Sequence, residues 1–148
     1  KEAISIREIF TVISIIGLII MGLLVFEPFR TEPPSPAVMA SNTKVATTQG
    51  SYCWSGILSS KCVEQIFLAQ KLAPTPVTPG EEVTIDFRTS PIAQSLKVEQ
   101  WIDEDHVHPI KMKDNALVAP TEKGVYVYYV TANWNKGDGH YAFSIVVQ

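Results

Sequence analysis

A chain of 148 residues with a formal net charge of −3 can hold one membrane segment and one domain of ordinary size. Its mildly acidic balance does not provide the positive surface that nucleic acids or anionic lipid membranes attract. We therefore expect no nucleic-acid partner.

The first segment with a clear assignment is residues 9–26, an uncharged apolar run bracketed by Glu8 and Glu27. A helix of this length spans about 27 Å, close to the roughly 30 Å hydrocarbon core of a bilayer. Because only a helix satisfies its own backbone hydrogen bonds in lipid, the run predicts one transmembrane helix and a location in the cell membrane.

A cleaved signal peptide is the alternative, since residues 38–40 have small side chains where a signal peptidase prefers them. That site lies too far beyond Phe26 for a normal signal peptide, so we expect an uncleaved single-pass anchor. Basic residues nearly balance on the two sides of the helix, and charge alone does not orient it. The two cysteines and the length of the C-terminal part favour residues 1–8 inside and the domain outside.

The segment that follows the helix, residues 27–43, contains four prolines together with Thr, Ser and Asn. Prolines without partners favour an extended polyproline-like chain. The sequence predicts a spacer that lifts an extracytoplasmic domain, residues 44–148, off the membrane.

Within residues 44–148 the periodicity changes to that of β-strands. Alternation of apolar and polar residues is clearest in residues 82–88, 96–102, 124–134 and 140–147. Shorter strands are predicted at 44–54, with a turn at Gly50, and at 75–80, 108–113 and 116–119. Residues 62–70 fit a strand or a short helix, and residues 135–139 fit a hairpin loop. About seven short strands predict an all-β Greek-key β-sandwich.

Two local resemblances bear on this fold. Residues 122–128 resemble the penultimate strand of immunoglobulin-like domains, in which a tyrosine after a glycine turn closes a corner; Tyr126 is the matching residue. The last two strands also resemble the C-terminal half of a cupredoxin. The copper ligands of that family would lie in residues 130–139, which contain neither Cys nor Met, so no blue-copper site is expected.

Cys53 and Cys62 are close in sequence and belong to a domain predicted to lie outside the membrane. This arrangement predicts a structural disulfide, worth roughly 2–3 kcal/mol in the chain-entropy model for so short a loop. Reduced thiols in a cytosolic domain, or a redox-active pair, are the alternatives. The Cys-x-x-Cys spacing of thioredoxin-like redox proteins is not present.

The histidines are the candidate metal ligands. His106 and His108 share one face of an extended segment beside an acidic turn, and His140 is the third histidine. Zinc or copper needs three or four converging ligands, so a solvated turn is the preferred interpretation and no cofactor is expected. No nucleophile elbow, phosphate-binding loop or zinc-protease motif occurs in the sequence, and we expect no enzymatic activity.

An aromatic motif, Gly50-x-Tyr52-x-Trp54, precedes Cys62, and a Tyr-Ala-Phe triplet begins at Tyr141. The combination resembles small exported or membrane-anchored proteins of Gram-positive bacteria, a set that implies fold and location but no established activity. One aromatic cluster is predicted; core packing is the preferred interpretation and an exposed binding platform the alternative, with Trp134, beside a glycine loop, the member expected to be exposed. Its members are Tyr52, Trp54, Trp101, Trp134 and Tyr141.

Two functional hypotheses follow. The preferred one is a single-pass protein that presents a non-catalytic binding domain to a membrane-protein or cell-envelope partner, as an accessory subunit or envelope protein. The alternative is a metal-handling or redox domain that uses the three histidines or the cysteine pair.

Overall fold

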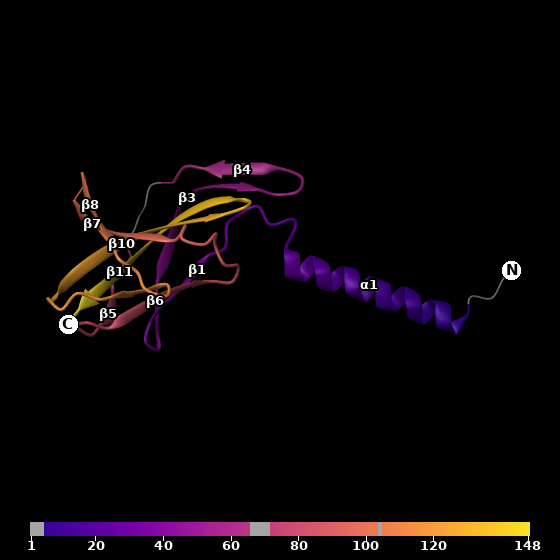
Figure 1. Ribbon diagram of the computed structural model, residues 1–148, viewed down its shortest axis with the longest axis horizontal. Coiled ribbons are helices and arrows are strands. Elements are labelled where there is room, and N and C mark those ends of the chain that lie inside the picture. The colour runs from indigo at the N-terminus through magenta and orange to yellow at the C-terminus, as the bar shows by residue number, and fades with distance from the viewer. Residues whose placement is uncertain (1–4, 66–71, 104) are drawn as a thin grey trace.

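The computed structural model describes residues 5–65, 72–103 and 105–148, in which one helix projects from a β-domain (Figure 1). The start of α1 and the C-terminus lie at opposite ends of the molecule. The helix is α1 (Ile6–Phe26) and the strands are β1 (Pro36–Ala40), β2 (Thr43–Val45), β3 (Thr47–Ser55), β4 (Ser60–Val63), β5 (Thr75–Val77), β6 (Glu82–Phe87), β7 (Lys97–Asp103), β8 (His106–Ile110), β9 (Ala116–Val118), β10 (Gly124–Trp134) and β11 (Gly137–Val147).

Helix α1 is long and apolar enough to cross a membrane, a test that an N-terminal signal sequence also meets, and none of its residues is buried. At its start the Glu8 carboxylate accepts a hydrogen bond from the Ser5 backbone N–H (3.1 Å). At its end Glu27 adopts a left-handed conformation (φ 39°), because the residue before Pro28 is kept out of the right-handed helical region. The helix therefore stops within one residue of the predicted boundary.

The strands form two sheets. The smaller has the order β2-β1-β6-β9, and the larger has the order β4-β3-β11-β10-β7-β8. Neighbouring strands in these two orders are antiparallel, whereas β5 pairs in parallel with the end of β11. The prediction of a mostly antiparallel β-domain after a single apolar helix is confirmed.

Alternation along the strands builds the core between the sheets. In β10 the even-numbered residues from Tyr128 to Trp134 are buried, and in β11 the odd-numbered residues from Tyr141 to Val147 are buried. They pack in one cluster with Val38 of β1 and Ile85 of β6. Both sheets therefore contribute one apolar face to the same core, as in a β-sandwich.

The predicted spacer is wrong over much of its length. Residues 36–40 are strand β1, which pairs with both β2 and β6. Pro33 and Pro34 are buried, and the Tyr141 hydroxyl donates a 2.6 Å hydrogen bond to the Pro34 carbonyl oxygen. The prolines do have partners, so the domain begins before residue 44 and the connection to α1 is short and packed.

Three smaller expectations differ from the structure or lie partly outside the described residues. Gly50 lies within β3 rather than in a turn, because the strand continues past it to Ser55. The predicted loop of residues 135–139 shrinks to Asn135 and Lys136, since β10 and β11 pair as far as Trp134 and Gly137. Of the segment 62–70, residues up to 63 belong to β4 and residues 66–70 lie outside the described residues.

Candidate functional site

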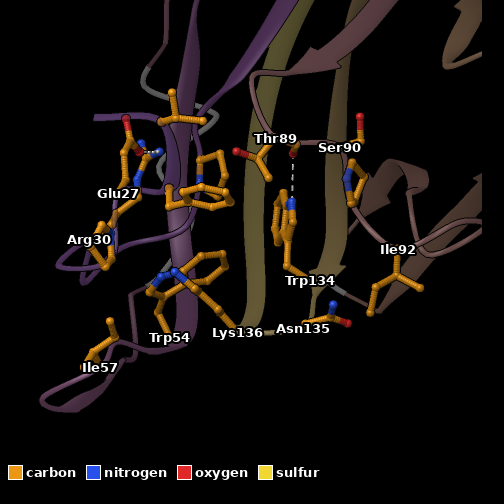
Figure 2. A pocket seen from close by; sticks show the side chains of 15 residues that line it. Glu27, Arg30, Trp54, Ile57, Thr89, Ser90, Ile92, Trp134, Asn135 and Lys136 are labelled. Atoms are coloured by element: carbon orange, nitrogen blue, oxygen red, sulfur yellow. Dashed lines mark hydrogen bonds and ion pairs between the residues drawn. The ribbon is translucent and has the colours of Figure 1, made fainter. Parts of the chain in front are cut away.

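A pocket of about 650 Å³ lies where α1 meets the β-domain, and we call it the junction pocket (Figure 2). The end of α1, the start of the linker, β3 and its turn, the loop after β6 and the β10–β11 turn all contribute to it. The residues that line it include Val25, Phe26, Glu27, Arg30, Trp54, Ile57, Thr89, Ile92, Trp134 and Lys136.

Two tryptophans form the domain side of the junction pocket. Trp54 and Trp134 meet edge to face with ring centroids 5.6 Å apart, and Phe87 contacts Trp134 at 5.1 Å. The Trp134 indole N–H donates to the Thr89 carbonyl oxygen (2.9 Å), a bond visible in Figure 2. The Trp54 indole N–H is buried and has no hydrogen-bond partner among the described residues. A buried donor without an acceptor is unfavourable, which makes Trp54 the unusual member of the pair.

The loop after β6 is held against β10 by backbone contacts. The Ile92 N–H donates to the Asn133 carbonyl oxygen (2.8 Å), and the Ser95 hydroxyl donates to the same oxygen (3.1 Å). The Asn133 N–H in turn donates to the Ser95 hydroxyl oxygen (3.2 Å). These bonds fix the wall of the junction pocket on which Ile92 lies.

Glu27 connects the helix to the domain. Its carboxylate lies 2.6 Å from the Arg30 guanidinium and 2.8 Å from that of Arg88, which follows β6. A carboxylate at a helix C-terminus opposes the helix dipole, and two cationic partners offset that cost. These two ion pairs link the end of α1 to the linker and to the residue that follows β6.

Lys136 is the cation of the β10–β11 turn. Its backbone carbonyl accepts a 2.7 Å hydrogen bond from Ser55, which joins this turn to the β3–β4 hairpin. The next residue, Gly137, has a φ of 151°, and a Cβ there would collide with the Cys53 carbonyl. The side chain of Lys136 is half-buried and forms no ion pair among the described residues.

Large apolar side chains are exposed around the same end of the molecule. Ile57 and Leu58, in the β3–β4 turn, are 68% and 83% exposed. Phe29 and Ile92 are also exposed. Figure 1 shows the β3–β4 turn and the β10–β11 turn pointing toward α1, with the C-terminus at the far end of the domain. Ile57 and Ile92 lie on opposite sides of the two tryptophans in Figure 2.

The predicted aromatic cluster is mostly core. Tyr52, Trp54, Trp134 and Tyr141 are all buried, so they do not form an exposed platform, and Trp134, the member expected to be exposed, is only 7% exposed. Trp101 belongs to a second cluster on the outer face of the larger sheet. Trp54 and Trp134 nevertheless reach a concave surface as walls of the junction pocket.

The Cys53–Cys62 disulfide is confirmed, and it joins directly opposite residues of β3 and β4. Beside it the Lys61 ammonium lies 3.3 Å from the Glu32 carboxylate and above the Tyr52 ring. The Tyr52 hydroxyl first, and then Glu32, raise the pKa of Lys61. These contacts attach the linker to the hairpin that carries Ile57 and Leu58.

The histidines do not converge in the structure. His106 and His108 are exposed on β8, where the His106 ring lies 2.7 Å from the Asp103 carboxylate. This hydrogen bond is the main reason that the pKa of Asp103 is lowered. His140, on β11, lies 3.2 Å from Asp138. Among the described residues no group of three or more His, Cys, Asp or Glu side chains is placed to hold a metal ion.

The junction pocket itself was not predicted. Its sequence signature is an apolar pair, Ile57-Leu58, in a turn flanked by Gly and Ser, at a position where polar residues are usual. Comparison with known proteins adds no assignment, since no family model, curated protein or solved structure matches the chain.

Proposed function

We propose that the chain is a single-pass membrane protein whose helix α1 crosses the cell membrane and holds a non-catalytic binding domain on the outer side. The observation that carries this proposal is α1 itself. Its exposed apolar surface needs a covering, and lipid is the covering that suits a helix that is apolar all round. The disulfide supports an extracytoplasmic place for the domain, because such bonds persist in oxidising compartments.

We further propose that the domain is Greek-key and immunoglobulin-like. In support, β6 and β9 lie in one sheet while β7, β10 and β11 lie in the other, and β5 runs parallel to the last strand. The Tyr126 hydroxyl donates a 2.9 Å hydrogen bond to the Glu122 carbonyl oxygen, four residues upstream, which is the geometry of a tyrosine corner. On this interpretation β1 and β2 extend one sheet and β3 and β4 extend the other.

Topology and redox state can be tested together in intact cells. Protease added to spheroplasts should degrade the domain and leave α1 with its short N-terminal segment protected. Cysteine alkylation after acid quenching should label neither Cys53 nor Cys62 until a reductant is added. Release of the full chain by alkaline carbonate would contradict the membrane anchor, and protection of the domain from protease would contradict its orientation.

Binding is tested by cross-linking in intact cells, which should recover the same membrane-protein or cell-envelope partner in repeated experiments. Repeated recovery of no partner would count against a binding role. The metal or redox alternative receives no specific support from the described residues, and metal analysis of the protein with and without His106→Ala and His108→Ala tests it.

A further inference from the structure

The geometry points to a lipid-docking surface at the end of the domain that faces α1. We propose that the β3–β4 turn enters the bilayer through Ile57 and Leu58, and that the junction pocket receives the phosphate headgroup of a neighbouring phospholipid at Lys136. This inference rests on the proposed membrane anchor, because it requires the domain to be held at the bilayer surface.

Position is the first argument. Val25 and Phe26, the last residues of α1, line the junction pocket together with Ile57 and Ile92. If α1 crosses the bilayer, its last turn lies at the boundary between hydrocarbon and headgroups. The opening of the pocket then lies at the same depth, where headgroups are the most abundant neighbours.

Exposed apolar surface is the second argument. Ile57 and Leu58 are exposed to water and therefore do not stabilise the turn, in which polar residues would be usual. Phe29 lies three residues beyond the end of α1 and is also exposed. Insertion of these side chains removes apolar surface from water along with α1, so the turn acts with the helix rather than as a separate patch.

Polar groups behind this apolar surface are the third argument. Lys136 is a cation with no ion pair among the described residues, whereas Arg30 and Arg88 share Glu27. A phosphate oxygen can accept from the Lys136 ammonium, and such a Lys–phosphate contact is charge-assisted. The acyl chains of the same lipid would lie along Val25 and Phe26.

Insertion can be measured by quenching with two lipids, one that carries bromine on the acyl chains close to the headgroup and one that carries bromine near the chain ends, which reaches the middle of a spanning helix. The full chain is reconstituted in phosphatidylcholine nanodiscs as Leu58→Trp, Val118→Trp and Leu18→Trp variants, and the quenching of each is corrected for the parent chain. Val118 is the matched control, because it is 66% exposed and pairs with Glu82, the residue of β6 farthest from Phe87. Leu18 lies in the middle of α1 and reports the anchor.

We expect strong added quenching for Leu58→Trp and none for Val118→Trp. Quenching of Leu18→Trp without quenching of Leu58→Trp would overturn the docking surface and leave the anchor in place. Absence of quenching for Leu18→Trp would show that α1 is outside the bilayer, and the proposed function would fail together with the inference.

Headgroup binding is tested with the full chain in a phosphate-free non-ionic detergent. Short-chain phosphatidylcholine, below its micelle concentration, should change the tryptophan fluorescence in a saturable way. Lys136→Gln should weaken this response about tenfold, as expected for loss of one charge-assisted hydrogen bond. The control Lys123→Gln, at the far end of β10, should leave it unchanged, and thermal melting confirms that both variants fold. An equal response to inorganic phosphate, or equal binding by both variants, would overturn the headgroup assignment.

Discussion

The hydrogen bond from the Tyr141 hydroxyl to the Pro34 carbonyl oxygen is the best place to test how the connection to α1 is held. The bond is 2.6 Å long and buried, Tyr141 is 1% exposed, and Pro34 is buried as well. In Tyr141→Phe the carbonyl keeps its position and loses its donor. Leaving a buried acceptor unpaired costs about 1–3 kcal/mol.

The assay is urea unfolding of the full chain in non-ionic detergent, followed by tryptophan fluorescence. We expect the free energy of unfolding to fall by about 1–3 kcal/mol, which for a domain of this size lowers Tm by about 4 °C per kcal/mol. Hydrogen exchange supplies a second measurement, since the Ser35 and Ala37 amides beside the released carbonyl should exchange faster.

The matched control is Tyr128→Phe. Tyr128 is equally buried, but no hydrogen bond joins its hydroxyl to another described residue. We expect a loss below about 0.5 kcal/mol there. Equal losses for the two variants, or unchanged exchange next to Pro34, would refute the argument that this bond holds the linker on the domain.

Three further predictions use other contacts. In chemical denaturation, Gly137→Ala should lower the free energy of unfolding by more than about 3 kcal/mol, because the added Cβ would collide with the Cys53 carbonyl. The control Gly80→Ala, at a φ of 73° with open space around it, should lower it by about 1 kcal/mol. The paired change Cys53→Ser and Cys62→Ser should cost about 2–3 kcal/mol in the same assay, and no loss would contradict the chain-entropy argument. Burial raises the pKa of Tyr128 to about 12, so this residue stabilises the fold below its unfolded pKa of 10 and loses that contribution as pH rises toward 12. Burial also raises the pKa of Tyr141, so ultraviolet titration should show one late-ionising phenol fewer in Tyr128→Phe than in the wild type.

Strand alternation and the disulfide could be predicted from the sequence because each depends on short-range patterns. In β10 burial alternates residue by residue from Tyr128 to Trp134, and Cys53 and Cys62 are separated by a span that one hairpin closes. The end of α1 follows from Glu27 and Pro28 in the same way, whereas its start does not: the helix begins at Ile6, before the predicted residue 9, and Glu8 lies in its first turn.

The linker could not be predicted, because the partners of its prolines are distant in the sequence. Pro34 and Tyr141, which share a hydrogen bond, are 107 positions apart in the sequence, and the pairing of β1 with β6 is not indicated by any local periodicity. The junction pocket was missed for a related reason. It is assembled from the helix end, the start of the linker, two turns and a loop, and its two tryptophans face a cavity while remaining buried overall.

The packed connection between α1 and the domain also limits mechanical freedom. An extended spacer over residues 27–43 would reach about 50 Å and would let the domain turn independently of its helix. With Glu27 paired to Arg88 and Pro34 bonded to Tyr141, the chain has no such lever arm. If α1 crosses a membrane and the domain binds a partner, as proposed, a movement of that partner would reach α1 through these few residues. The orientation of the helix would then depend on what the domain binds.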